Sequence, residues 1–129
     1  MSRLTAPLLT VALLGLAACG GDAASATTAP ADADAVVRAQ ASVEWDQSSY
    51  AATATDGKVI VTLINDSGQP HNLHIVDGDN NDIDKSAKEP EVSQRGDTST
   101  ATFALAAGEY RVVCEVPGHS NMNSKFVVA

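Results

Sequence analysis

Four side chains that suit a soft metal ion are the most informative residues in this sequence. Cys114, His119 and Met122 lie within nine consecutive residues and are spaced Cys-x4-His-x2-Met, while His71 stands more than forty residues upstream of the cysteine. A turn between two strands can fold the first three side chains toward one point, and a neighbouring strand can supply the fourth. The pattern therefore predicts that a thiolate, two imidazoles and a thioether meet at a single metal ion.

The chemistry of these donors selects the metal. Two imidazoles and a thiolate in a trigonal set, with a weak axial thioether, are the ligands of electron-transfer copper sites. Zinc sites usually recruit more cysteines or a carboxylate, and zinc gains little from a thioether. We therefore expect one copper ion per domain, which alternates between Cu(I) and Cu(II).

Other roles for these residues fit the pattern less well. Cys114 and His119 could act as a nucleophile and its base, but such a pair needs a third orienting group and an open cleft. A dinuclear copper-A centre needs two cysteines in the loop, and this loop has one. His74 lies three positions after His71, so on a strand it faces the opposite side and is not expected to touch the metal.

The elements that must position these donors are short β-strands separated by turns. Segments rich in β-branched and apolar residues predict six strands, at 42–45, 58–64, 72–76, 98–105, 109–113 and 125–128. No segment of ten or more residues shows sustained helical periodicity, and residues 77–97 form one long polar loop. The spacing of strands and turns predicts a single all-β sandwich.

At the donor residues the sequence resembles the cupredoxins, the blue copper proteins that include plastocyanin, azurin and amicyanin. Segment 70–75 reads PHNLHI and is similar to the first-histidine strand of amicyanin, whereas segment 114–119 reads CEVPGH and resembles the ligand loop of azurins. Segment 122–128 reads MNSKFVV and resembles the return strand of the family. The resemblance implies a Greek-key β-sandwich with copper at one end, and an electron carrier that is not an enzyme.

The resemblance also implies roles for residues around the metal. Asn72 is similar to the asparagine that links the two ligand loops in this family, with its backbone N–H directed at the thiolate sulfur. Pro117 is similar to a proline that keeps the ligand loop stiff and removes a hydrogen-bond donor near the site. Such partners orient ligands and tune the reduction potential. His119 would be the exposed ligand through which electrons leave.

The axial position has two interpretations. The loop combines the Cys–His spacing of azurins with the shorter His–Met spacing of amicyanins. Met122 is the expected axial ligand, but Asn121 or Asn123 could offer an oxygen atom instead, because weak axial positions tolerate one.

The first 41 residues are expected to lie outside the folded domain. Residues 1–18 contain Arg3 and an apolar run that ends in Leu-Ala-Ala before Cys19, which resembles a bacterial lipobox and predicts a signal peptide. We expect a lipid on the sulfur of Cys19 and a disordered tether rich in Ala, Thr and Asp over 19–41. Cys114 is then the only thiol of an exported domain, where a free thiol without an occupant is a liability.

Charge and location limit the partners. Residues 42–129, the expected domain, hold 6 Lys+Arg and 13 Asp+Glu, a formal charge of 6 − 13 = −7, which argues against nucleic acid. We expect a monomer at the outer face of a bacterial membrane, in the periplasm or at the cell surface, that exchanges electrons with redox proteins. The main alternative is a protein that stores, delivers or buffers copper without electron transfer. The methionine- or histidine-rich tracts of copper handlers are absent, which favours the carrier.

Overall fold

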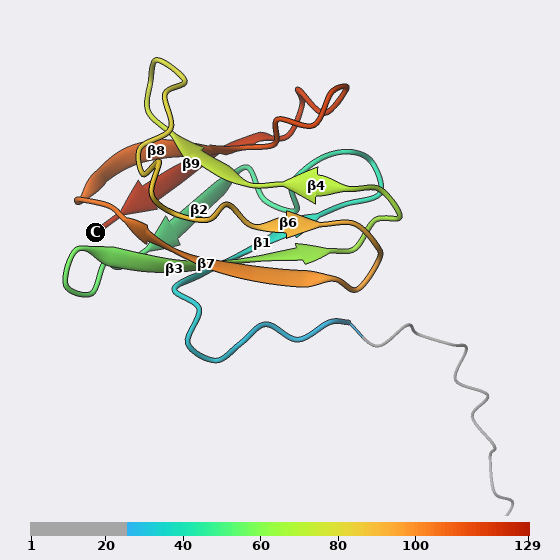
Figure 1. The fold of residues 1–129 in the computed structure, drawn as a ribbon, viewed down its shortest axis with the longest axis horizontal. Coiled ribbons are helices and arrows are strands. Elements are labelled where there is room, and N and C mark those ends of the chain that lie inside the picture. Colours follow the sequence, from blue (N-terminus) through green and yellow to red (C-terminus); the bar gives the residue numbers. More distant parts are fainter. Residues whose placement is uncertain (1–25) are drawn as a thin grey trace, which may run out of the picture.

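A computed structural model describes residues 26–129, and within them the chain is built of β-strands (Figure 1). The strands are β1 (Ala35–Ala39), β2 (Ser49–Ala52), β3 (Lys58–Asn65), β4 (His71–Asn72), β5 (His74–Val76), β6 (Glu91–Val92), β7 (Thr98–Ala104), β8 (Gly108–Val113) and β9 (Asn123–Val128). The expected all-β sandwich in a single domain is confirmed. No helix in the described part of the chain is long and apolar enough to cross a membrane.

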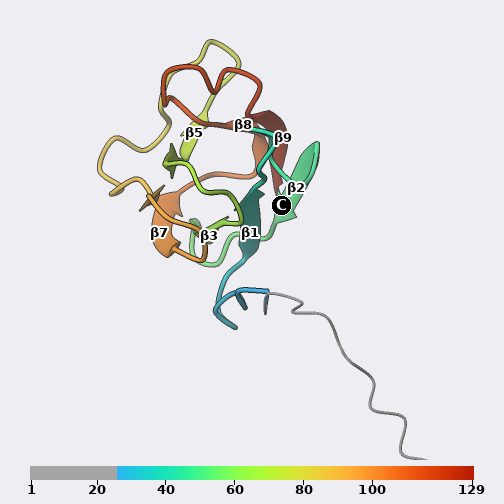
Figure 2. The ribbon, with the colours of Figure 1, turned by 90° about the vertical axis from the view of Figure 1, so that its right-hand side faces the viewer.

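Two larger sheets form the layers of the sandwich (Figure 2). One has the strand order β1-β3-β7 and the other the order β2-β9-β8-β5, and a short pair, β4 and β6, makes a third sheet. The pairs β1–β3 and β2–β9 are parallel, and the remaining pairs are antiparallel. Sequence neighbours therefore often lie in different sheets, so the connections must cross from one layer to the other.

The core lies between the two larger sheets. In β3, Val59, Val61 and Leu63 are fully buried in the core cluster, because alternate residues of a strand point to the same face. Phe126 of β9 is also fully buried, and apolar burial of this kind is the main driving force for folding. Trp45 joins the core and satisfies its indole N–H by donating to the carbonyl oxygen of Val112 at 3.2 Å.

The predicted tether was too long, because strand β1 lies inside it. Ala35, Val37 and Ala39 are buried at alternate positions, and the whole strand pairs in parallel with residues 61–65 of β3. The sequence suggested no strand here because alanines give a weak hydropathy pattern and the partner is distant in the chain. The folded part thus begins before residue 42. The expected signal peptide and the lipidated Cys19 lie outside the described residues.

Two predicted strands also need correction. Residues 42–44 turn the chain, with a φ of 59° at Val43, and Trp45 makes an isolated antiparallel bridge with Ala39; the second strand comes later, at β2. The single strand expected at 72–76 is two short strands, because Leu73 donates its backbone N–H to Pro90 and separates β4 from β5. β4 then pairs with β6, which lies inside the expected loop 77–97, whereas β5 pairs with β8.

Candidate metal centre

Three of the four predicted donors, His71, Cys114 and His119, meet at one end of the sandwich, which faces the viewer in Figure 2. His71 begins β4, Cys114 directly follows β8, and His119 lies in the loop between β8 and β9. One donor atom from each of these three buried residues lies within 4.8 Å of the others. The Cys114 Sγ atom is 3.7 Å from His119 Nδ1, and the two imidazole rings have centroids 4.8 Å apart with a 38° angle between their planes. A thiol and two ring nitrogens therefore surround one point.

Backbone hydrogen bonds close the loop that carries three of the four predicted donors. Cys114 N donates to Met122 O at 3.1 Å, and Met122 N donates to His119 O at 2.9 Å. Gly118 has a φ of 88°, a left-handed conformation that glycine adopts without the cost a side chain would add. The loop is thus held at its base and at its tip.

Burial separates the candidates for the axial position. Met122 has an exposed fraction of 1% and packs in the same apolar cluster as Cys114. Asn121 and Asn123 are both exposed, and Asn123 opens strand β9. The thioether is therefore on the inner side of the loop, and the two amide side chains are on its outer side.

The hydrogen bonds of Ser67 decide how the His71 ring faces the site. The Ser67 hydroxyl donates to Asn65 Oδ1 at 2.8 Å, and the Ser67 Oγ atom also lies 2.7 Å from His71 Nε2. Because the hydroxyl proton is already committed, Ser67 Oγ accepts from Nε2–H, and His71 Nδ1 carries the lone pair. This Nδ1 atom is buried and has no hydrogen-bond partner among the described residues. A buried lone pair without a partner, beside a thiol, fits a metal ligand.

The electrostatics of His71 favour the same state. Burial, and then repulsion from His119, lowers the pKa of His71 below its ordinary value. A lowered pKa keeps the imidazole neutral, and only the neutral ring can bind a metal ion.

His119 is less accessible than the resemblance implied. Its exposed fraction is 6%, and its Nε2 atom lies 3.3 Å from Gln69 Oε1, which can accept the Nε2 proton. The exposed side chain of Gln69 thus contacts the outer edge of the ring and contributes to its burial. Gln69 and Ser67 were not among the residues predicted from the sequence. Their position in the turn just before His71 was the signal that could have identified them.

A hydrogen bond joins the two segments that carry the donors. Glu115 N donates to Asn72 Oδ1 at 2.7 Å, which links β4 to the residue after Cys114. This is the link between loops that the resemblance implied for Asn72. Pro117 is exposed in the ligand loop and, as a proline, brings no N–H to it.

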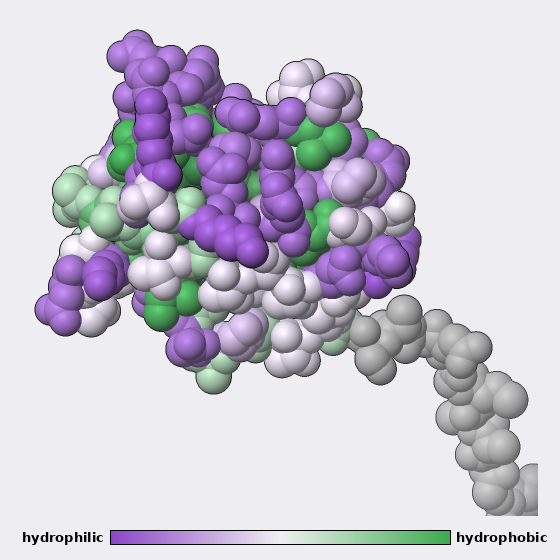
Figure 3. Space-filling model, viewed as in Figure 1, coloured by the Kyte–Doolittle hydropathy of each residue, from purple (hydrophilic) through white to green (hydrophobic). Residues whose placement is uncertain are grey.

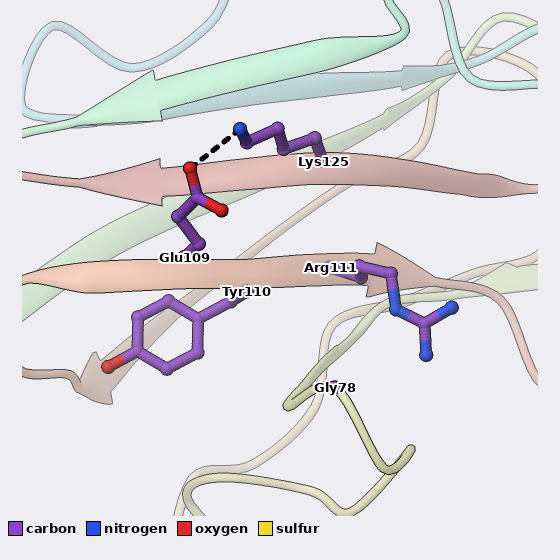
Figure 4. Close-up of a pocket in the computed structure, with 5 residues that line it drawn as sticks. All are labelled: Gly78, Glu109, Tyr110, Arg111 and Lys125. Atoms are coloured by element: carbon purple, nitrogen blue, oxygen red, sulfur yellow. Dashed lines mark ion pairs between the residues drawn. The ribbon is translucent and has the colours of Figure 1, made fainter.

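Two other features lie outside this cluster. As expected, His74 does not join the three donors, and it instead contacts Asp82 and Glu89; the reason differs from the one expected, because His71 and His74 belong to separate strands, β4 and β5. A surface pocket beside β8 and β9 is drawn in Figure 4. It is lined by Gly78, Glu109, Tyr110, Arg111 and Lys125, none of which is a predicted donor. Lys125 Nζ and Glu109 Oε1 form an ion pair there at 2.7 Å.

Known proteins share this sequence pattern and fold. The model of the family described as copper binding proteins, plastocyanin/azurin family, matches residues 33–129, which include β1. The solved structure of auracyanin A, a blue copper protein of Chloroflexus aurantiacus, is 26% identical and covers 73% of this chain and 96% of its own, with a TM-score of 0.58.

An oxidised P96G mutant of amicyanin is 28% identical and covers 77% of this chain and 85% of its own, with a TM-score of 0.53. An azurin of Methylomonas sp. strain J is 16% identical and covers 77% of this chain and 99% of its own; its TM-score of 0.58 shows likeness of fold alone. No curated protein sequence matches the chain. The match to the family model over residues 33–129 shows that this chain belongs to the plastocyanin/azurin family of copper-binding proteins.

Proposed function

We propose that this protein holds one type 1 copper ion through His71, Cys114, His119 and Met122 and carries single electrons between extracytoplasmic redox proteins. The observation that carries the proposal is the convergence of one donor atom each from His71, Cys114 and His119 within 4.8 Å, together with a buried His71 Nδ1 that has no hydrogen-bond partner in the described part of the chain. Copper supplies the one-electron redox chemistry, and the chain supplies its ligands and their surroundings.

The residues around the donors are arranged for rapid electron exchange. Ser67 and Gln69 contact the Nε2 atoms of the two histidines, which leaves both Nδ1 atoms free of these contacts, and His119 Nδ1 lies 3.7 Å from the Cys114 sulfur. The loop hydrogen bonds and the Asn72–Glu115 link hold these groups in place. A ligand set fixed by its surroundings changes little between the two oxidation states, so little rearrangement accompanies the gain or loss of an electron.

The outer edge of His119 is the exit that we propose for the electron. Its Nε2 atom points toward the exposed Gln69, whereas His71 is turned inward toward Ser67. A redox partner that docks over Gln69 would reach the site through His119 alone. Such a partner has to approach the end of the sandwich that faces the viewer in Figure 2.

The N-terminal part of the proposal concerns location. Residues 1–18 would be a signal peptide and Cys19 the lipidated residue, with a linker that ends before β1. The apolar run that ends at Cys19 supports this proposal. Cys19→Ala should move the protein from the membrane fraction to the soluble extract. If the variant stays with the membranes, the lipid anchor is wrong.

Reversible electron transfer tests the function. The copper-loaded protein should give a reversible one-electron wave in voltammetry and should reduce and reoxidise without losing copper. A protein that only stores or delivers the metal should instead release Cu(I) to a chelator and show slow, irreversible reduction. That second result would contradict the carrier function while leaving copper binding intact.

A further inference from the structure

A second group of donor atoms surrounds His74 on strand β5. His74 Nδ1 lies 2.9 Å from Glu89 Oε1 and 3.2 Å from Asp82 Oδ1. One donor atom from each of the three residues lies within 4.8 Å of the others. His74 is buried, with an exposed fraction of 6%, whereas the two carboxylates are half-buried and reachable from solvent.

The other nitrogen of the same ring is also buried. His74 Nε2 has no hydrogen-bond partner among the described residues, and Glu115 Oε2 lies 3.7 Å away from it. The ring thus has two carboxylates at one nitrogen and a third at the other. Metal-bound histidines commonly direct their free N–H toward a carboxylate, which fixes the ring and raises its basicity.

The charges of this cluster are not balanced by basic side chains. Among residues 26–129, no lysine or arginine forms an ion pair with Asp82, Glu89 or Glu115. Burial, together with repulsion from Asp82 and Glu115, raises the pKa of Glu89 even though His74 acts in the opposite direction. The loop between β5 and β6, which supplies Asp82 and Glu89, projects at the upper left of Figure 1, and its surface in Figure 3 is hydrophilic.

We propose that His74, Asp82 and Glu89 form a second metal site, which binds a divalent cation with the ligand preference of Zn²⁺. Zn²⁺ binds His nitrogen and Asp or Glu oxygen at about 2.0–2.2 Å, which places tetrahedral ligands about 3.3 Å apart. The separations of 2.9 and 3.2 Å from Nδ1 need only small adjustments to reach this value. Water would complete the coordination.

The proposal assigns a proton state to the ring. Nδ1 gives its lone pair to the cation, and Nε2–H is directed at Glu115, which orients the ring without binding the metal. The competing explanation is an imidazolium ion, protonated at both nitrogens and paired with the carboxylates, which has no lone pair to give. The two explanations differ in whether Zn²⁺ binds at all, so zinc binding decides between them.

The experiment uses the copper-loaded, reduced protein, in which the first site is filled and the metal is diamagnetic. Titration calorimetry with Zn²⁺ should show one equivalent of zinc bound with copper retained. Asp82→Asn and Glu89→Gln keep the side-chain shapes and should each weaken zinc binding at least ~10-fold, since even residues that only orient a ligand contribute 10–100-fold. Asp79→Asn removes a carboxylate charge from an exposed neighbour and should leave zinc affinity unchanged.

A second measurement, by ¹⁵N NMR, reports the metal binding and protonation of the His74 ring. Zinc should shift the ¹⁵N resonance of His74 Nδ1, with Nε2 remaining protonated, and should leave the resonances of His71 unchanged. The proposal is overturned if the reduced copper protein binds no zinc, if Asp79→Asn weakens binding as much as Asp82→Asn, or if the His74 Nδ1 resonance does not move. None of these outcomes depends on whether the protein transfers electrons, so failure here leaves the proposed function standing.

Discussion

Replacing Ser67 with alanine tests whether the Ser67 hydroxyl orients the His71 ring toward the metal. Ser67 is 1% exposed, and its Oγ accepts from His71 Nε2 at 2.7 Å. The alanine variant leaves this buried N–H without an acceptor, which costs about 1–3 kcal/mol of folding stability. It also frees the ring to turn, and loss of a partner that orients a metal-bound histidine typically lowers metal affinity by about 10–100-fold.

The assay separates these two effects with a matched variant. Ser124 is a buried serine whose hydroxyl donates to Gln47 O at 2.7 Å, and this hydrogen bond involves none of the predicted ligands. Urea denaturation of the copper-free proteins should show that both Ser67→Ala and Ser124→Ala are destabilised. Competition with a Cu(I) chelator should show weaker copper binding only for Ser67→Ala. Equal copper affinity in the two variants would refute the role of Ser67 in orienting His71.

Three further results are expected. Met122→Leu should keep copper but raise the reduction potential in voltammetry, because an apolar side chain stabilises Cu(II) less than a thioether does; an unchanged potential would remove Met122 from the site. Asn72→Ala removes the acceptor for Glu115 N and should lower the unfolding free energy of the copper-free protein by about 0.5–1.5 kcal/mol, measured by urea denaturation. Burial, and then Asp46, raises the pKa of the Tyr50 hydroxyl, so above about pH 10 the folded protein keeps this proton whereas the unfolded chain loses it. The free energy of unfolding should therefore fall as the pH rises above about 10, and it should fall less in Tyr50→Phe.

The donors could be predicted because three of them lie in one short motif. The spacing of Cys114, His119 and Met122 within a single loop carries its chemistry without knowledge of the fold. Strands such as β3 and β9 were predicted close to their observed bounds because β-branched and aromatic residues mark them. Strand β1 was missed because its alanines are only weakly apolar, and its burial depends on pairing with a strand more than twenty residues away.

Contacts that depend on loop conformation could not be predicted from the sequence. The pairing of Ser67 with His71 depends on the turn that places a hydroxyl beside the Nε2 atom of the ring. The contact between His119 and the side chain of Gln69 joins two segments that are distant in the sequence. The cluster of His74 with Asp82 and Glu89 likewise requires the path of a long loop that shows no regular pattern. Each of these contacts joins residues whose types alone do not indicate a partner.

The visible spectrum of the protein after addition of one equivalent of Cu(II) tests the central claim most directly. The convergence of Cys114 with His71 and His119 predicts an intense blue band from thiolate-to-copper charge transfer, which Cys114→Ser abolishes. Cu(II) bound without this band, or a band that persists in Cys114→Ser, would contradict the account.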